Sequence, residues 1–459
     1  MFNLSDTIAA ICTPPGVGGI AAIRISGPDA FEIAKIIYSQ TKEDEVAQPR
    51  FQHMHALYGC IKDNEKIIDE VIILPFQSPK SFTAEDVVEI YCHGGNQIAS
   101  IILDLCLKNG ACLAKAGEFT FRAFINGRID LTEAEAIHEI IHADTQKAVY
   151  SSSIVLLGLL KEKVSTFRER LFNLITSIES SIEFPMDVPN LGQDEIFSSL
   201  NDINSELGSL IESSEEGKLL RSGVKVVIIG APNVGKSSLL NQFLESQRAI
   251  VANEPGTTRD TIEEKVIIDG WPVVFIDTAG IRERKSLNNE AELLGIERSK
   301  AALENADLAL LVFDLKNGKD KNTEEIFKLV DGKPKIIVGN KIDLVENKSQ
   351  NGFDIAISAR YGTNLDKLKK LIVEKVISLT HASCFMPHAS FYINQRQKEL
   401  LLQCSSHIGF AIEILTKNSP EDLVADELKK AVSNLDEVTG RKISDAVIAN
   451  IFAKFCIGK

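Results

Sequence analysis

The octapeptide GAPNVGKS at 230–237 fits the phosphate-binding pattern GxxxxGK[ST]. It follows an apolar run at 224–229 and precedes a helix-forming run, where a loop between a strand and a helix must lie. Backbone N–H groups of such a loop surround phosphate oxygens, while Lys236 reaches the β- and γ-phosphates and the Ser237 hydroxyl binds Mg²⁺. The residues expected around the phosphates are Asn233, Val234, Gly235, Lys236, Ser237 and Ser238. This motif alone leaves the base undecided.

Three further motifs follow in the order that guanine recognition requires. Asn340, Lys341 and Asp343 form an NKxD motif, in which the Asp343 carboxylate can accept both N1–H and the exocyclic amine of guanine. A site built on such hydrogen bonds selects against a base that lacks these donors by a factor of roughly 10⁴ or more. Ser358 and Ala359 are expected to offer a backbone N–H to guanine O6. The Mg²⁺ and γ-phosphate side is expected at Asp277, Thr278, Ala279 and Gly280. Each piece alone also fits a solvated loop or turn, so the joint order carries the prediction of GTP binding.

The elements that position these motifs suggest several domains, because 459 residues exceed one compact core. Short β-like and helical runs mix in the first stretch, helical spacing of apolar residues follows, and a strand, turn and helix pattern surrounds the nucleotide motifs. We expect a multidomain fold with an α/β P-loop GTPase domain inserted into an all-α domain. The predicted domains are an α+β N-terminal domain at 1–118, a first helical part at 119–218, the inserted α/β domain at 219–379 and a second helical part at 380–459.

Composition indicates an ordinary soluble protein, with 44% hydrophobic and 25% charged residues. We predict no membrane span, because no run reaches the roughly 18 apolar residues that one needs. The eight cysteines lack CxxC pairs and the N-terminus lacks a secretory pattern, which predicts a reducing, cytoplasmic location. The net charge of −14 indicates that any RNA contact uses local patches or a partner's surface.

Motifs outside the nucleotide site extend over the rest of the chain. They are DTIAA at 6–10, TPPG at 13–16, RISGP at 24–28, TAEDVVE at 83–89, HGG at 93–95, GEFTFRAF at 117–124 and FCIGK at 455–459. With them the whole chain resembles the MnmE (TrmE) family of tRNA-modification GTPases. The resemblance implies an N-terminal domain that dimerises and binds a formyl- or methylene-tetrahydrofolate. The matching positions are Arg24, Glu89, Arg128 and Lys459, which by themselves would be taken as surface charges.

The sequence departs from the family pattern near this cofactor site. Arg128 stands where the family usually has lysine, and Val17 stands where it usually has arginine. Cys456 is a candidate catalytic thiol near the one-carbon unit, and a buried apolar thiol is the alternative.

Hydrolysis needs a water-positioning group other than the glutamine of Ras-like GTPases, because Ile281 follows the DTAG motif. Asn233 and the run GTTRD at 256–260 resemble the potassium-dependent GTPases. That resemblance implies Thr258 as the second Mg²⁺ ligand beside Ser237, and Glu292 as the residue that positions water; a solvated helix glutamate is the alternative for Glu292. The implied K⁺ ligands are Asn233, Ala252, Glu254 and Thr257, although ANEP at 252–255 departs from the family's usual stretch.

The family's activity implies a partner and a substrate. With the flavoprotein MnmG, which carries FAD, a homodimer of the chain would form a heterotetramer. This complex would add a carboxymethylaminomethyl-type group to C5 of wobble uridine 34 in tRNA, driven by GTP hydrolysis. The alternative is an Era-type regulatory GTPase that binds structured RNA. The C-terminal half lacks a GxxG loop of the KH type, and the FCIGK terminus also disfavours this alternative.

An HExxH pattern at 138–142 matches the zinc-protease signature. The extended signature needs a glycine and a further histidine, but Thr145 and Ala148 occupy those places. We therefore expect no zinc site at His138 and His142.

Overall fold

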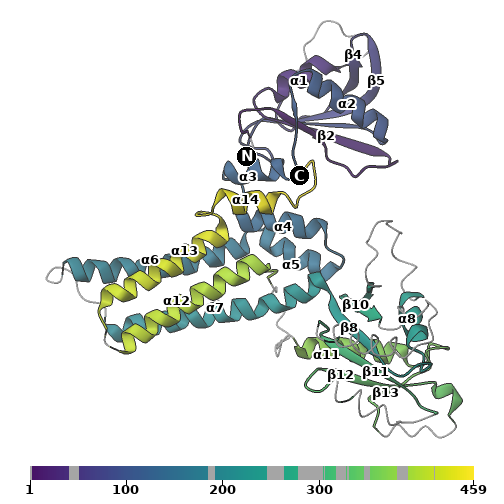
Figure 1. Ribbon diagram of the computed structural model, residues 1–459. Coiled ribbons are helices and arrows are strands. Elements are labelled where there is room, and N and C mark those ends of the chain that lie inside the picture. The colour runs from purple at the N-terminus through teal and green to yellow at the C-terminus, as the bar shows by residue number, and fades with distance from the viewer. Residues whose placement is uncertain are drawn as a thin grey trace, which may run out of the picture. The chain divides into compact units, whose positions relative to one another are not determined.

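The computed structural model forms two compact units (Figure 1). It describes residues 3–40, 51–184, 192–245, 263–277, 303, 305–316, 327, 330–345, 352–379, 391–417 and 419–459. The first unit combines Met1–His138, Val155–Ile196 and Ser406–Lys459. The second unit combines Glu139–Ile154 and Phe197–Ser405.

A seven-stranded sheet in the order β3-β4-β5-β6-β2-β1-β7 organises the N-terminal part of the first unit. Its neighbours are antiparallel, except for the parallel pair β1–β7. Helices α1 and α2 share one hydrophobic core with this sheet. The bounds are β1 Ile8–Ile11, β2 Ile20–Ser26, α1 Ala30–Ile37, β3 Tyr38–Ser39, β4 Leu57–Asp63, β5 Lys66–Phe76, β6 Val87–His93, α2 Asn96–Lys108 and β7 Cys112–Leu113. This part is the α+β fold that the sequence predicts.

Side chains along β2 and β6 point alternately to the two faces of the sheet, and one of these faces packs against the helices. Ile23 and Ile25 of β2 are buried in the core beneath α1 and α2. Because successive side chains of a strand point to opposite faces, Arg24 lies on the other face. Arg24 is paired in register with Glu89 of β6, so both charged residues share that second face.

Helices make up most of the remaining chain outside the second sheet. They are α3 Glu118–Ile125, α4 Leu131–Ile141, α5 Gln146–Leu156, α6 Leu159–Glu183, α7 Gln193–Ser222, α12 Gln395–Thr416, α13 Glu421–Thr439 and α14 Asp445–Phe452. In the first unit α6 and α13 lie side by side (Figure 1). Their contact buries apolar residues at helical spacing, among them Leu171 and Ile175 of α6 and Leu428 and Leu435 of α13. None of the helices in the described ranges is long and apolar enough to span a bilayer.

A six-stranded sheet in the order β13-β12-β11-β8-β10-β9 lies in the second unit. All neighbours are parallel except the antiparallel pair β9–β10. The bounds are β8 Val224–Ile229, α8 Lys236–Glu245, β9 Glu263–Ile268, β10 Trp271–Asp277, β11 Leu308–Asp314, β12 Lys335–Asn340, the 3₁₀ helix η1 Ile342–Leu344, β13 Ile355–Ala356 and α11 Leu365–Leu379. The carboxyl ends of parallel strands meet at one edge, which is where ligands bind in such sheets.

Both faces of this sheet are covered, as a parallel sheet requires. Val226 and Ile228 of β8 belong to a core that includes Phe243 of α8 and Ile372 of α11. The alternate residues Val227 and Ile229 belong to a second core. The sheet is therefore the α/β fold expected around the nucleotide motifs.

The first of these cores also contains residues of the helical segments. Ala148 of α5 and Leu220 of α7 lie in the same cluster as Val224 and Trp271. The Lys147 ammonium lies 4.7 Å from the centroid of the buried Trp271 ring. Helices α5 and α7 thus contribute residues to the hydrophobic core on one face of the α/β sheet.

Candidate nucleotide and cofactor sites

The phosphate-binding loop lies between the end of β8 and the start of α8. Gly235 has a φ of +99°, and a Cβ there would lie 2.2 Å from Asn340 Nδ2. A Cβ on Gly230 would lie 2.2 Å from the carbonyl oxygen of Val312 in β11. Glycine at both positions therefore lets the loop lie directly against the neighbouring strands, as the motif predicts.

The charged end of Lys236 lies over this loop. Its Nζ donates hydrogen bonds of 2.9 Å to the carbonyl oxygens of Gly230 and Ala231. Ser237 and Ser238 lie in the first turn of α8, at the end of the helix that favours anions. The cation, the hydroxyl groups and the helix N-terminus that a phosphate group needs are thus together.

Asn340 joins the phosphate loop to the segments that recognise the base. Its Nδ2 donates to the Val234 carbonyl oxygen at 2.8 Å, and its Oδ1 accepts from the Ala359 N–H at 2.9 Å. The side chain is 2% exposed, so both bonds are made in a dry environment. Ser358 beside Ala359 is fully buried, whereas Asp343 is exposed on η1. The structure therefore brings together three motifs, the first of which lies more than 100 residues before the other two in sequence.

The remaining nucleotide-site predictions fall largely outside the described residues. The backbone of Asp277 ends β10 and is in register with Ile228 of β8, next to the start of the phosphate loop. The other predicted residues, which lie outside the described residues, are Ala252, Glu254, Thr257, Thr258, Thr278, Ala279, Gly280 and Glu292.

An arginine–carboxylate pair forms the centre of the predicted cofactor site. Arg24 Nη2 and Nε lie 2.8 and 2.9 Å from Glu89 Oε1, and each side chain is 15% exposed. The Tyr91 hydroxyl donates to Glu89 Oε2. Burial and this carboxylate raise the pKa of Tyr91 to about 12. The Glu89 carboxylate is thus oriented by two donors, and the tyrosine stays protonated at neutral pH.

Aromatic rings flank the cations of this site. The Arg24 guanidinium lies 4.9 Å from the Phe82 ring centroid and 5.6 Å from that of Phe119. Arg128 lies 5.1 Å from the same Phe82 ring and donates to the Phe82 carbonyl oxygen at 3.0 Å. Arg24 and Arg128, which are 104 positions apart in sequence, are therefore gathered around one phenyl ring.

The C-terminal residues lie against β1 at the same site. A Cβ on Gly458 would lie 2.5 Å from the Ile11 carbonyl oxygen and 3.0 Å from Cys12 Cα. Burial raises the pKa of the Cys12 thiol, while the charges of Arg24 and Lys459 lower it and that of Glu89 raises it. Cys12 is thus within electrostatic range of three of the predicted cofactor residues. Cys12, which directly precedes the TPPG motif, was not predicted as a site residue from its sequence.

Cys456 differs from Cys12 in its exposure. Its side chain is exposed, and its carbonyl oxygen accepts from the N–H groups of Gly117 and Lys459 at 3.3 Å each. The alternative of a buried apolar thiol at Cys456 is therefore wrong.

We expect iodoacetamide at pH 8 to alkylate Cys456 and the exposed Cys112 at least about tenfold faster than Cys12. The reason is that Cys12 is partly buried and that its raised pKa lowers the fraction of reactive thiolate. Peptide mass spectrometry over a time course measures the three rates. Equal rates at Cys12 and Cys456 would contradict this arrangement.

The residues of the HExxH pattern make an ion pair and a ring contact. Glu139 Oε2 lies 3.0 Å from Arg221 Nε, and Arg221 Nη1 donates to the Tyr392 hydroxyl at 3.0 Å. The His138 ring lies 5.3 Å from the Phe455 ring. Within the described ranges no group of three or more His, Cys, Asp or Glu side chains could hold a metal ion. Glu139 thus acts as an ion-pair partner of α7.

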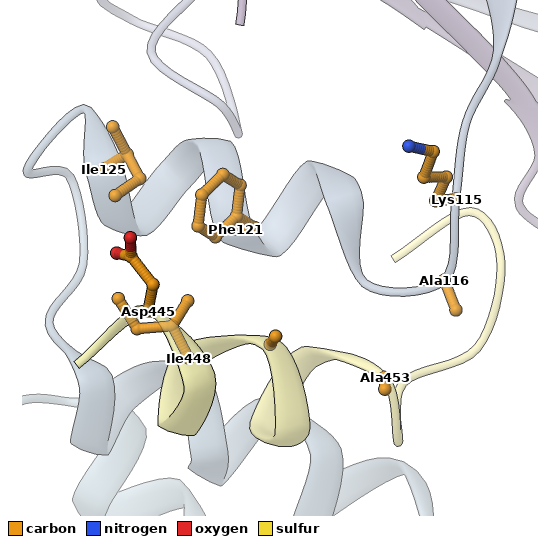
Figure 2. A pocket seen from close by; sticks show the side chains of 8 residues that line it. Lys115, Ala116, Phe121, Ile125, Asp445, Ile448 and Ala453 are labelled. Carbon is orange, nitrogen blue, oxygen red and sulfur yellow. The ribbon is translucent and has the colours of Figure 1, made fainter. Parts of the chain in front are cut away.

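A pocket of about 350 Å³ lies between α3 and α14 (Figure 2). Phe121 and Ile125 of α3 line one side, and Ile448 and Asp445 of α14 line the other (Figure 2). Lys115, Ala116, Ala449 and Ala453 complete the lining. The wall is mainly apolar and contains none of the predicted nucleotide or cofactor residues.

A glycine-rich loop that is clamped to NKxD and SA motifs at the edge of a parallel sheet defines a P-loop GTPase. The sequence model of the MnmE helical domain matches residues 131–456, and that of the GTP-binding protein TrmE N-terminus matches residues 7–128. The chain belongs to the MnmE family of tRNA modification GTPases. It is a GTPase that acts in tRNA modification.

Relatives match over nearly the whole length. The tRNA modification GTPase MnmE of Acetivibrio thermocellus is 39% identical over 466 residues, covering 99% of each chain. That of Thermoanaerobacter sp. strain X514 is 40% identical over 465 residues, again covering 99% of each chain. Among solved structures, an Era variant of Aquifex aeolicus bound to GDP.AlF4- is 28% identical, covering 40% of this chain and 66% of that chain. Its TM-score is 0.26, so that superposition supports no conclusion.

Proposed function

We propose that this GTPase, with the flavoprotein MnmG, adds a carboxymethylaminomethyl-type group to C5 of wobble uridine 34 in tRNA. The observation that carries the proposal is the match to MnmE relatives over 99% of the chain, which includes both sites described above. FAD would enter only with the partner, in a heterotetramer built on a homodimer of this chain. Cytoplasmic tRNA is the substrate in this proposal.

The same proposal assigns the cluster around Arg24 to a formyl- or methylene-tetrahydrofolate, which supplies the one-carbon unit. The residues present fit this cofactor because they combine cations, an oriented carboxylate and aromatic rings. The cations of Arg24, Arg128 and Lys459 would attract the anionic cofactor, while Glu89, which is held by Arg24, would accept hydrogen bonds from the pterin amines. Cys456 would lie near the carbon unit from the C-terminal segment.

Glu89→Gln is expected to weaken binding of 5-formyltetrahydrofolate about tenfold or more, because the substituted amide loses the charge that accepts from the pterin. Isothermal titration measures the dissociation constant. Glu70→Gln, which changes an exposed carboxylate on the same sheet, is the matched control and should bind normally. Normal binding by Glu89→Gln would argue against this assignment.

In the second unit we propose that GTP hydrolysis opens and closes a pair of G domains. Ser237 and Thr258 would bind Mg²⁺, and Glu292 would position the attacking water. The K⁺ ligands in this proposal are Asn233, Ala252, Glu254 and Thr257. The proposed domains are those at 1–118, 119–218, 219–379 and 380–459. Insertion of the third is supported by one helical-domain match that runs from 131 to 456 on both sides of it.

GTP hydrolysis is expected to be roughly tenfold or more faster in KCl than in NaCl at equal ionic strength. The reason is that a cation held by Asn233 would stabilise the charge that develops on the phosphates. Phosphate release at saturating GTP measures the rates. Equal rates in the two salts would remove K⁺ from the mechanism.

The overall proposal is tested by expressing this chain in a bacterium that lacks the activity and analysing its tRNA nucleosides by mass spectrometry. C5-aminomethyl-type wobble uridines should return with the unaltered chain and be absent with Lys236→Ala. If they do not return even when the chain's own flavoprotein is supplied, while the protein is stable and hydrolyses GTP, the RNA-binding regulatory alternative is favoured.

A further inference from the structure

Asp314, the last residue of β11, places a buried carboxylate behind the NKxD motif. Its side chain is 9% exposed. One oxygen, Oδ1, accepts from the Lys316 backbone N–H at 2.9 Å, which fixes the orientation of the group. The other oxygen, Oδ2, lies 2.7 Å from Lys341 Nζ. A buried carboxylate that is oriented before it meets its cation forms a strong, specific pair.

Lys341 shares its ammonium group between this carboxylate and the phosphate loop. Nζ also donates to the Asn233 carbonyl oxygen at 2.8 Å. The backbone φ of Lys341 is +66°, in the left-handed region, which a lysine adopts only when surrounding contacts hold it. An ammonium has three donors, and two of them have these fixed partners.

Consecutive residues of the NKxD motif thus hold consecutive carbonyl groups of the loop. Asn340 holds the carbonyl of Val234, and Lys341 holds the carbonyl of Asn233. In register, Asp314 of β11 is the direct neighbour of Asn340 on β12. The three side chains therefore link the strand ends to the loop through direct polar contacts.

We propose that Asp314 is a positioning residue for guanine-nucleotide binding. By holding the Lys341 ammonium on the Asn233 carbonyl, it fixes the phosphate loop relative to the base-recognition segment. A nucleotide must contact both segments at once, so fixing their separation before binding lowers the ordering cost of the complex. Without the carboxylate, the ammonium of Lys341 is free to turn towards water.

The test compares Asp314→Asn with the unaltered chain, since asparagine keeps the shape and removes the charge. We expect the dissociation constants of GTP and of a fluorescent GDP analogue to rise about tenfold. KM for GTP should rise by the same factor, while kcat changes less than about twofold. ITP, which lacks the guanine 2-amino group, should lose affinity by the same factor as GTP. Asp366→Asn is the matched control, because that carboxylate is 94% exposed in the same unit.

A double-variant cycle with Lys341→Met separates positioning from general stability. If Asp314 acts through Lys341, adding Asp314→Asn to Lys341→Met should cause little further loss of affinity. Additive losses would overturn the proposal, as would unchanged affinity in Asp314→Asn. Circular dichroism melting checks the folded fraction. A purely structural role would lower the melting temperature and the number of binding sites per chain while leaving the dissociation constant of the folded protein unchanged, and this result would also overturn the proposal.

Discussion

Asp343→Asn is expected to weaken GTP binding by roughly 10³-fold or more and to transfer the preference to xanthosine triphosphate. The carboxylate accepts two N–H groups of guanine, whereas the amide of asparagine presents a donor to the guanine 2-amino group. Xanthine has an oxygen at that place, which accepts from the amide. Competition binding and hydrolysis rates with GTP, XTP and ATP measure the change.

The position of Asp343 on η1, outside the buried core, means that this substitution should leave the fold intact. XTP hydrolysis by Asp343→Asn at near the normal maximal rate would show that the catalytic groups remain in place. Unchanged GTP affinity would show that base selection lies elsewhere.

Arg122→Met is expected to destabilise the first unit by about 3–5 kcal/mol, because it removes one partner of a buried ionic network. Arg122 is fully buried. Its Nη1 donates to the Asp6 carbonyl oxygen at 2.8 Å and lies 3.1 Å from Glu85 Oε2. Its Nη2 donates to the Asn3 carbonyl oxygen at 3.1 Å and to Glu118 Oε1 at 3.2 Å. Methionine fills a similar volume but leaves both carboxylates without this cation.

Urea unfolding followed by circular dichroism measures this loss, and GTP affinity in the second unit serves as an internal check that should not change. Arg441→Met is the matched control, since that exposed guanidinium contacts only the Ser165 hydroxyl, at 3.4 Å, among its described polar contacts. An unfolding midpoint equal to that of the unaltered chain would mean that the network contributes little.

The sequence predicted the nucleotide-binding sheet well because its central strands are almost entirely apolar: β8 has one charged residue, Lys225, and β11 has only its last residue, Asp314. The run at 224–229, which predicts a strand before the phosphate loop, coincides with β8. Strands of this kind are buried on both faces of the sheet, so nearly every residue is apolar. The strand can therefore be recognised without knowing which strands lie beside it. Strands β4 and β9 give a weaker sequence signal, because their apolar residues stand beside several polar ones, such as Lys62 of β4 and Lys265 of β9.

The contacts within the sites were less accessible to sequence reasoning. Motif spacing predicted the phosphate loop and the NKxD segment, since their chemistry is local. The pair of Asp314 with Lys341 and the approach of Lys459 to Cys12 depend on how distant strands and the terminus pack. For the pair of Asp314 with Lys341, the sequence does contain a sign: an aspartate that ends an otherwise apolar strand. No local pattern marks the approach of Lys459 to Cys12, because these two residues are separated by almost the entire chain.

The participation of Ala148 and Leu220 in the core beneath Trp271 has a practical consequence for fragments of this protein. A polypeptide cut to 219–379 retains every nucleotide motif but lacks Ala148 and Lys147, whose ammonium lies over the indole. It would expose an aromatic surface that is 3% exposed in the whole chain. Such a fragment would tend to self-associate through the uncovered face, and its rates would then describe the aggregate instead of the GTPase.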